Sequence, residues 1–111
     1  MKIKILSVAK SNLKEISSYI TINNSADIAD NVIAEIKKLI ASLKELPNRG
    51  SYVKELEEAG NDRYRQLHYK PYRIIYTVDD GKGIVFIHTI IDGRRDLNTV
   101  LKQIFIHNKL N

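Results

Sequence analysis

The spacing of apolar residues changes along the chain, and each spacing predicts a different element. In Lys2-Ile3-Lys4-Ile5-Leu6, basic and apolar residues alternate, which is typical of a short strand. The apolar residues that follow recur at steps of three and four, which predicts one buried face of a helix. They are Ala9, Leu13, Ile16 and Ile20.

A second apolar stripe predicts another helix, which begins after the turn Asn23-Asn24-Ser25 and ends before Pro47. This turn supplies an N-cap, and Asp27 and Asp30 follow near the helix start, where the helix dipole favours acidic side chains. Residues 9–46 are therefore expected to form a helical hairpin with one apolar side. The stripe consists of Ile28, Val32, Ile36, Leu39, Leu43 and Leu46.

The second half of the chain contains three segments rich in β-branched and aromatic residues, which predict strands. Residues 79–83 hold two glycines and predict a hairpin loop, whereas residues 51–62 are expected to be an exposed loop. A last apolar stripe at helical spacing predicts a C-terminal helix. The strands are Tyr64–Tyr69, Tyr72–Val78 and Ile84–Ile91, and the last stripe is Leu97, Val100, Leu101, Ile104 and Phe105.

Together these elements predict a single α+β domain over residues 1–111. Its N-terminal helical hairpin packs on a mostly antiparallel sheet of about four strands, and a short C-terminal helix follows. Because the hairpin covers only one face of the sheet, the other face is expected to be partly open. An open sheet face in a small protein is a candidate interaction surface.

Composition excludes several classes of protein. The chain has no cysteine, so a disulfide scaffold, a thiolate metal site and a cysteine nucleophile are excluded. No apolar run approaches the roughly 20 residues of a membrane helix, and the first residues do not resemble a secretory signal. These features fit a protein of the cytoplasm.

The net charge of +5 indicates an acidic partner, either a nucleic acid or an acidic protein. Residues 1–60 carry nine basic and eight acidic residues, whereas residues 61–111 carry nine basic and five acidic ones. The first part therefore contributes +1 and the second +4. A solvated basic face is the structural alternative to a binding surface.

The sequence contains no phosphate-binding loop, dinucleotide-binding motif or zinc-protease motif. His68, His88 and His107 lie far apart and lack metal-ligand spacing, so neither a metal nor a cofactor is expected. The most informative local cluster is Gly93-Arg94-Arg95-Asp96, between a strand and the last helix. Its arginines suit phosphate or carboxylate, and Asp96 can cap the helix or pair with an arginine in a structural corner.

A second cluster, Arg63 to Lys70 followed by Tyr72 and Arg73, alternates basic and aromatic residues on predicted strands. Arginine can hold phosphate and tyrosine can stack on bases, so this pattern suits nucleic acid. The structural alternative is that the tyrosines are half-buried strand residues and the arginines are solvated. Strand alternation places Tyr64, Gln66 and His68 on one face of the sheet, opposite to the side chains between them.

The order of elements and two motifs resemble the RelE/ParE superfamily of toxins from bacterial toxin–antitoxin modules. The motifs are Pro71-Tyr72-Arg73-Ile74-Ile75-Tyr76 and, some twenty residues later, Gly93-Arg94-Arg95-Asp96-Leu97. The resemblance covers nearly the whole chain. It implies one of two activities: RelE-like toxins cleave messenger RNA on the ribosome, whereas ParE-like toxins poison DNA gyrase and are not themselves enzymes.

The ribonuclease pattern of RelE is incomplete here. The resemblance implies two strand lysines, two arginines and a helix tyrosine that support RNA cleavage. Arg73 and Arg95 match the arginines, but Tyr64, Gln66 and Leu101 stand at the other three positions. The departures favour the ParE branch. In the ribonuclease alternative, the catalytic residues would be His68, Arg73 and Arg95, with no metal. An inactive member that only binds antitoxin is a third possibility.

The resemblance also implies partners. A cognate antitoxin with an acidic or partly disordered C-terminal segment would bind the toxin in a hetero-oligomer, and no membrane is involved. The target would be DNA gyrase or, in the alternative, the ribosome with its mRNA. Candidate target-binding residues are Arg73, Arg94, Arg95 and Lys102, and Gly93 and Asp96 are the candidate structural corner.

Overall fold

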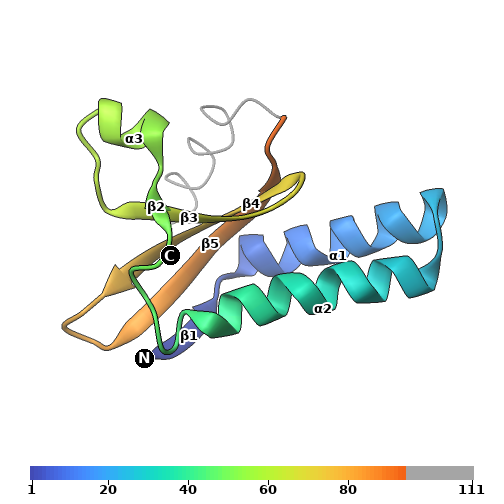
Figure 1. The fold of residues 1–111 in the computed structure, drawn as a ribbon, viewed down its shortest axis with the longest axis horizontal. Coiled ribbons are helices and arrows are strands. Elements are labelled where there is room, and N and C mark those ends of the chain that lie inside the picture. Colours follow the sequence, from blue (N-terminus) through green and yellow to red (C-terminus); the bar gives the residue numbers. More distant parts are fainter. Residues whose placement is uncertain (95–111) are drawn as a thin grey trace.

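The structure is a computed structural model, and it describes residues 1–94. The predicted C-terminal helix and the candidate residues Arg95, Asp96 and Lys102 lie outside the described residues. The described part contains three helices and five strands (Figure 1). The helices are α1 (Ser7–Asn23), α2 (Ala26–Ser42) and α3 (Lys54–Glu58), and the strands are β1 (Lys2–Ile5), β2 (Ser51–Tyr52), β3 (Tyr64–Tyr69), β4 (Tyr72–Asp79) and β5 (Ile84–Asp92).

The strands form one sheet in the order β1-β5-β4-β3-β2. Three of the four strand pairs are antiparallel, and β1 pairs with β5 in parallel. The predicted α+β class and the mostly antiparallel sheet are therefore confirmed. The sheet has five strands rather than about four, because the chain forms the short edge strand β2 before it reaches β3.

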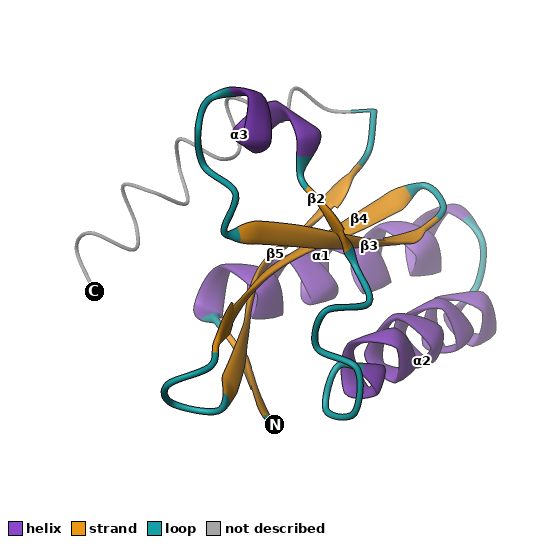
Figure 2. Ribbon diagram, turned by 60° about the vertical axis from the view of Figure 1, so that its left-hand side comes forward, coloured by secondary structure: helices purple, strands orange, loops and turns teal. Residues whose placement is uncertain are grey.

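The helical hairpin covers one face of the sheet (Figure 2). Ser25 caps α2 as expected, since its Oγ accepts a hydrogen bond from the backbone N–H of Ile28 at 3.1 Å. Leu13 and Ile36 are among the core residues that the two helices contribute. No helix within residues 1–94 is long and apolar enough to cross a membrane.

Two members of the predicted apolar stripe lie outside the core. Ile28 is 48% exposed and Leu46 is 60% exposed. Ile28 stands in the first turn of α2, away from the face that holds Ala29 and Ile36, both fully buried. The helix ends at Ser42, so Leu46 belongs to the connection that leads to the sheet rather than to the helix.

A side-chain contact fixes α1 to an irregularity in the sheet. The register between β4 and β5 shifts by one residue between Ile75 and Tyr76. Next to this shift, Oδ1 of Asn12 accepts hydrogen bonds from the Thr89 hydroxyl at 2.8 Å and from the Ile90 N–H at 3.0 Å. The bulge therefore exposes strand groups toward α1, and Asn12 satisfies them.

Residues 51–62 are not an exposed loop, and this expectation is wrong. They form the edge strand β2 and the helix α3, and α3 lies on the face of the sheet opposite to the hairpin (Figures 1 and 2). Val53 is fully buried and Leu56 is 8% exposed. Both pack with Tyr64, Ile75 and Ile91 in a second core cluster. Burial of these two isolated apolar residues holds an otherwise acidic segment against the sheet.

Candidate functional site

Arg73 lies at the centre of a hydrogen-bonded network on the sheet face that α3 covers. Its Nη1 donates to Oε2 of Glu55 at 2.9 Å, and its Nη2 donates to Oε1 of the same carboxylate at 3.2 Å. Its Nε donates to Oε1 of Gln66 at 2.7 Å. The Gln66 amide nitrogen in turn donates to the Tyr52 carbonyl at 3.3 Å. We call these four residues the Arg73 network.

Burial and charge both favour the pairing of the Arg73 guanidinium with the Glu55 carboxylate. The side chain of Arg73 is only 14% exposed. The hydrogen bond from Arg73 lowers the pKa of Glu55 below its ordinary value of 4.5, against the opposing effect of burial. Glu55 is therefore ionised at neutral pH and balances the charge of Arg73. A phosphate could take the same guanidinium edge only by displacing this carboxylate.

The other residues on this face that the sequence analysis named differ in their exposure to solvent. Tyr64 and Gln66 are buried, at 5% and 8% exposure. His68 is exposed and stands directly opposite Arg73 in the β3–β4 register. The structure thus brings together two of the three residues of the ribonuclease alternative, and Arg95 lies outside the described part of the chain. Whether His68 and Arg73 have a catalytic role stays a prediction.

Glu55 is the functional neighbour that sequence reasoning missed. The segment around it was expected to be a solvated loop, so its acidic residues had no assigned partner. Val53 and Leu56, on either side of Glu55, are three residues apart, which is the spacing of one buried helix face, and both are buried. Two apolar residues are too few to define a period, however, and the partner Arg73 is eighteen positions away in sequence.

His88 is buried on the same sheet face and is held neutral. Its Nε2 lies 2.8 Å from the Thr77 hydroxyl, and its ring packs edge-on against Tyr64 with ring centres 5.1 Å apart. Burial and the nearby charge of Arg63 lower the pKa of His88 to about 4. Within residues 1–94, no group of three potential ligands is arranged to hold a metal ion.

Arg65, from the basic and aromatic cluster, also has a structural role. Its Nη1 donates to the carbonyls of Asn48 at 3.2 Å and Gly50 at 2.8 Å. Its Nη2 donates to the Tyr52 hydroxyl at 3.1 Å, and the guanidinium carbon lies 4.3 Å from the centre of the Tyr52 ring. Arg65 therefore fastens β2 and the loop before it to the edge of the sheet.

The chain makes a tight corner after β5 at Gly93, and the expected partner in this corner, Asp96, lies outside the described residues. The Gly93 N–H donates to the Pro71 carbonyl at 2.7 Å. A Cβ at Gly93 would lie 3.1 Å from that carbonyl oxygen, so the close approach favours glycine. Arg94 follows with its side chain 80% exposed, and it binds both carboxylate oxygens of Asp92. This pair presents a guanidinium to solvent in a fixed orientation.

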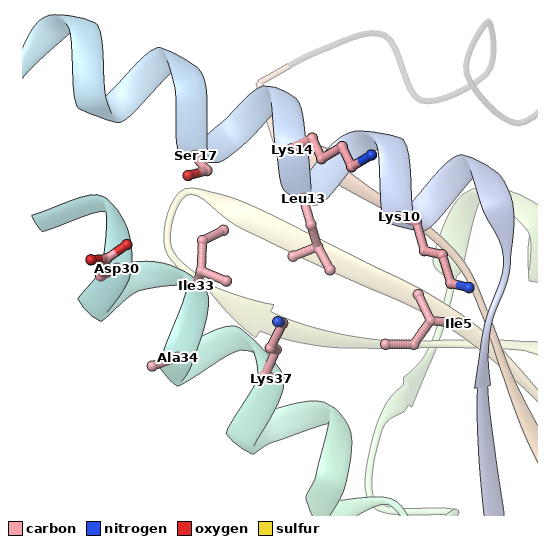
Figure 3. A pocket seen from close by; sticks show the side chains of 9 residues that line it. All are labelled: Ile5, Lys10, Leu13, Lys14, Ser17, Asp30, Ile33, Ala34 and Lys37. Atoms are coloured by element: carbon pink, nitrogen blue, oxygen red, sulfur yellow. The ribbon is translucent and has the colours of Figure 1, made fainter. Parts of the chain in front are cut away.

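A second surface feature is a groove between α1 and α2 (Figure 3). It has a volume of about 600 Å³, and its apolar residues Leu13, Ile33 and Ala34 are bordered by charged ones. Three lysines and one aspartate stand on its rim. We call this the interhelical groove, and its lining is Ile5, Lys10, Leu13, Lys14, Ser17, Asp30, Ile33, Ala34 and Lys37.

Comparison with known families decides the relationship of this chain. The family described as the ParE toxin of type II toxin–antitoxin system, parDE, matches residues 3–97. The chain belongs to the ParE toxin family. The suspected membership in the RelE/ParE superfamily is thereby confirmed. Among curated proteins, no sequence matches this ParE-family chain at a significant level.

Solved structures support the fold of this ParE-family chain. A chain of the chromosomal ParDE toxin–antitoxin system from P. aeruginosa aligns with a TM-score of 0.68 and 17% identity, covering 83% of this chain and 95% of that one. A chain of the RelBE2 toxin–antitoxin complex from Mycobacterium tuberculosis aligns with a TM-score of 0.58 and 18% identity, covering 82% and 95%.

The isolated RelE toxin from E. coli aligns with a TM-score of 0.60 and 17% identity, covering 93% of this chain and 97% of that one. Both branches of the superfamily therefore share this fold. At such low identity the likeness extends to the fold alone. The choice between the two activities must come from the residues on the sheet face.

Proposed function

We propose that this ParE-family toxin acts in the cytoplasm by poisoning DNA gyrase, and that an antitoxin neutralises it by forming a hetero-oligomer with it. In this proposal the toxin carries out no chemistry of its own and needs no cofactor. It binds gyrase and traps the cleaved DNA intermediate of that enzyme. Strand breaks then accumulate and growth stops. The candidate contact residues remain Arg73, Arg94, Arg95 and Lys102.

The main support for this proposal is the Arg73 network, in which the guanidinium is already paired within the protein. RNA cleavage without a metal needs a base for the 2′-hydroxyl, an acid for the leaving oxygen, and cations for the phosphorane. Here the guanidinium of Arg73 is bound by Glu55 and Gln66. Tyr64 and Gln66 stand at the two β3 positions where the ribonuclease pattern has lysine; both are buried, and burial raises the pKa of Tyr64 above its ordinary value of 10. Neither of these two positions therefore supplies an acid or a base at neutral pH.

The interhelical groove supports an antitoxin partner. Its apolar floor suits the apolar side of an added segment, and Lys10, Lys14 and Lys37 suit acidic side chains. Two of the similar structures come from toxin–antitoxin complexes or systems, namely ParDE of P. aeruginosa and RelBE2 of M. tuberculosis. An acidic segment that becomes ordered on binding fits both the charge of the rim and the overall charge of +5.

One observation favours the ribonuclease alternative. His68 is exposed and adjacent to Arg73 across the β3–β4 pair. An exposed imidazole that a substrate hydroxyl can reach is a candidate general base. In this alternative the toxin cleaves mRNA on the ribosome, and α3 must move before Arg73 can reach a phosphate. An inactive antitoxin-binding protein is the remaining possibility.

Expression of the toxin without antitoxin separates the three possibilities. Gyrase poisoning predicts growth arrest with filamentous cells and an induced DNA-damage response, and it predicts the same phenotype for His68→Ala. Ribosomal mRNA cleavage predicts arrested translation without that response, and loss of arrest in His68→Ala. Normal growth with folded toxin present identifies the inactive protein. Filaments in both wild type and His68→Ala support the proposal, and either other outcome overturns it.

A further inference from the structure

A pocket of about 450 Å³ lies beside α1, where the helix passes the start of β4 and the end of β5. It shares no lining residue with the interhelical groove. Aromatic, apolar and charged side chains meet in it. We call it the Tyr19 pocket, and its lining includes Glu15, Ile16, Tyr19, Tyr72, Asp92 and Arg94.

The α1 side of this pocket exposes large apolar side chains. Glu15, Tyr19 and Ile22 follow one another at steps of four and three residues, so they share one face of the helix. Tyr19 is 65% exposed and Ile22 is 82% exposed. The stretch 16–26 contains no charged residue. Exposed apolar side chains that stand together on a small protein indicate a contact surface.

Two opposite charges border this surface. Glu15 is exposed and forms no ion pair within residues 1–94. Arg94 donates to Asp92 through Nε and Nη2, which leaves its Nη1 for a second carboxylate. The hydrogen bond to Asp92 raises the pKa of Arg94. Tyr19 and Tyr72 raise the same pKa to a smaller extent, so both phenols lie near the guanidinium.

We propose that the Tyr19 pocket, together with Ile22, binds a second copy of this chain in a two-fold symmetric dimer, in which Glu15 of each protomer pairs with Arg94 of the other. A two-fold interface uses the same patch on both copies, so the patch must be complementary to itself. A patch with one acid, one base and exposed apolar side chains meets this condition. Tyrosine and arginine are also enriched among the residues that contribute most to protein interfaces.

Charge favours a second copy over other partners. An acidic segment placed on this surface would meet Glu15, and a basic segment would meet Arg94, so either would face a like charge. A net charge of +5 makes two copies of the chain repel each other over much of their surface. The uncharged stretch 16–26 lets them approach there, and the two symmetric pairs of Glu15 with Arg94 attract.

The dimer should be weak. A stable interface uses roughly 20–30 residues on each side, and this surface offers fewer, so we expect a dissociation constant of about 10–100 µM. At the far lower concentrations of a DNA cleavage assay the chain is then monomeric. Self-association is measured on the toxin alone, so its outcome does not depend on the target proposed above.

Charge reversal with purified full-length toxin tests the pairing directly. Glu15→Arg and Arg94→Glu each place like charges at both symmetric contacts, so each should weaken dimerisation at least about tenfold. An equimolar mixture of the two variants restores opposite charges at both contacts and should recover a dimer close to wild-type affinity. Sedimentation velocity over a range of concentrations that brackets the expected constant measures all three.

Matched controls separate the contact from net charge. Glu35→Arg and Lys38→Glu make the same changes in net charge at exposed positions of α2 outside the pocket. Alone or mixed, they should self-associate like the wild type. Tyr19→Ala changes no charge and should also weaken the dimer, because it removes an exposed ring from the interface. Thermal unfolding checks that each variant is folded.

Three outcomes overturn the proposal. They are a wild-type toxin that stays monomeric over the whole range, self-association that survives both charge reversals, and a mixture that fails to recover the dimer. If a charge-reversal variant does not fold, Tyr19→Ala decides, and unchanged self-association of folded Tyr19→Ala contradicts the assignment.

Discussion

Arg73 on β4 and Glu55 on α3 bind each other through two hydrogen bonds of 2.9 and 3.2 Å. This pair joins a strand in the middle of the sheet to a helix that the sequence did not predict. It also occupies the guanidinium that a ribonuclease of this fold would direct at phosphate. The same contact therefore supports the fold of residues 51–62 and the non-enzymatic function proposed here.

Replacing Arg73 by alanine should lower the free energy of unfolding by about 2 kcal/mol, because Glu55 and Gln66 both lose a charged hydrogen-bond partner. Glu55→Ala should cost about 1 kcal/mol, since the Glu55 side chain is 36% exposed and solvent screens the pair. Denaturant unfolding of both single variants and the double variant measures the coupling. Glu58→Ala, an exposed residue of the same helix, is the matched control. Additive losses would contradict the pairing.

Gly50 should tolerate no side chain. Its N–H donates to the Tyr76 hydroxyl at 2.9 Å, and that hydroxyl donates to the Pro47 carbonyl at 2.9 Å. A Cβ at Gly50 would lie 2.5 Å from the Tyr76 oxygen and 2.6 Å from the Gln66 carbonyl oxygen. Gly50→Ala should therefore destabilise the protein by about 1–3 kcal/mol. Gly81→Ala, whose Cβ would meet nothing closer than 3.5 Å, should change the melting temperature little.

The stability of the toxin should fall as the pH decreases from about 6.5 to about 4. In the unfolded chain the His88 imidazole has its ordinary pKa near 6.5 and takes up a proton in this range, whereas in the folded protein its pKa is about 4 and it stays neutral. Proton binding therefore favours the unfolded chain, with a loss of at most about 3 kcal/mol. Glu55, whose pKa is lowered, adds a separate loss below its ordinary value of 4.5.

The contribution of His88 is isolated by comparing variants across this pH range. His88→Gln should remove the loss between pH 6.5 and 4, because the buried imidazole is gone. His68→Gln should retain it, because His68 is exposed. Unfolding free energies measured at half-unit pH steps test both expectations. Equal pH dependence in wild type and His88→Gln would show that the imidazole is not the group responsible.

Arg94→Ala should weaken target poisoning several-fold without loss of stability. The guanidinium is 80% exposed and is oriented by Asp92, so its contact with a partner would lose little side-chain entropy. The midpoint of thermal unfolding is expected to stay unchanged, because the side chain lies in solvent. The measurement compares toxin-dependent DNA cleavage and thermal unfolding for Arg94→Ala and for Lys38→Ala, an exposed residue of α2. Full activity in Arg94→Ala would remove this residue from the contact surface.

The sequence predicts most of the fold because its elements are marked by clear local signals. Apolar residues recur every second position in β1 and every three or four positions in α1, which separates the two elements. Ser25 marks the start of α2. The strand Tyr64–Tyr69 has its predicted bounds, and β4 and β5 each extend one residue beyond theirs. Leu67 and Tyr64 lie in different core clusters, as strand alternation predicts.

The candidate site is harder to predict because its state depends on contacts distant in sequence. Arg73 can be singled out from the family motif, but whether it is solvated or paired is decided by Glu55, in a segment without periodicity. The same holds for Arg65, which binds carbonyl groups of the loop before β2. Basic and aromatic residues on strands suit both nucleic acid and structural contacts, and only the folded chain distinguishes these uses.

The most direct test of the account is a DNA cleavage assay with purified toxin, active gyrase, ATP and supercoiled plasmid. The products are treated with detergent and protease, so that any trapped cleavage intermediate is released as linear DNA. The account predicts linear plasmid in proportion to the toxin added, and also with His68→Ala. Absence of linear DNA with folded toxin and active gyrase, together with mRNA cleavage on ribosomes that requires His68, would contradict it.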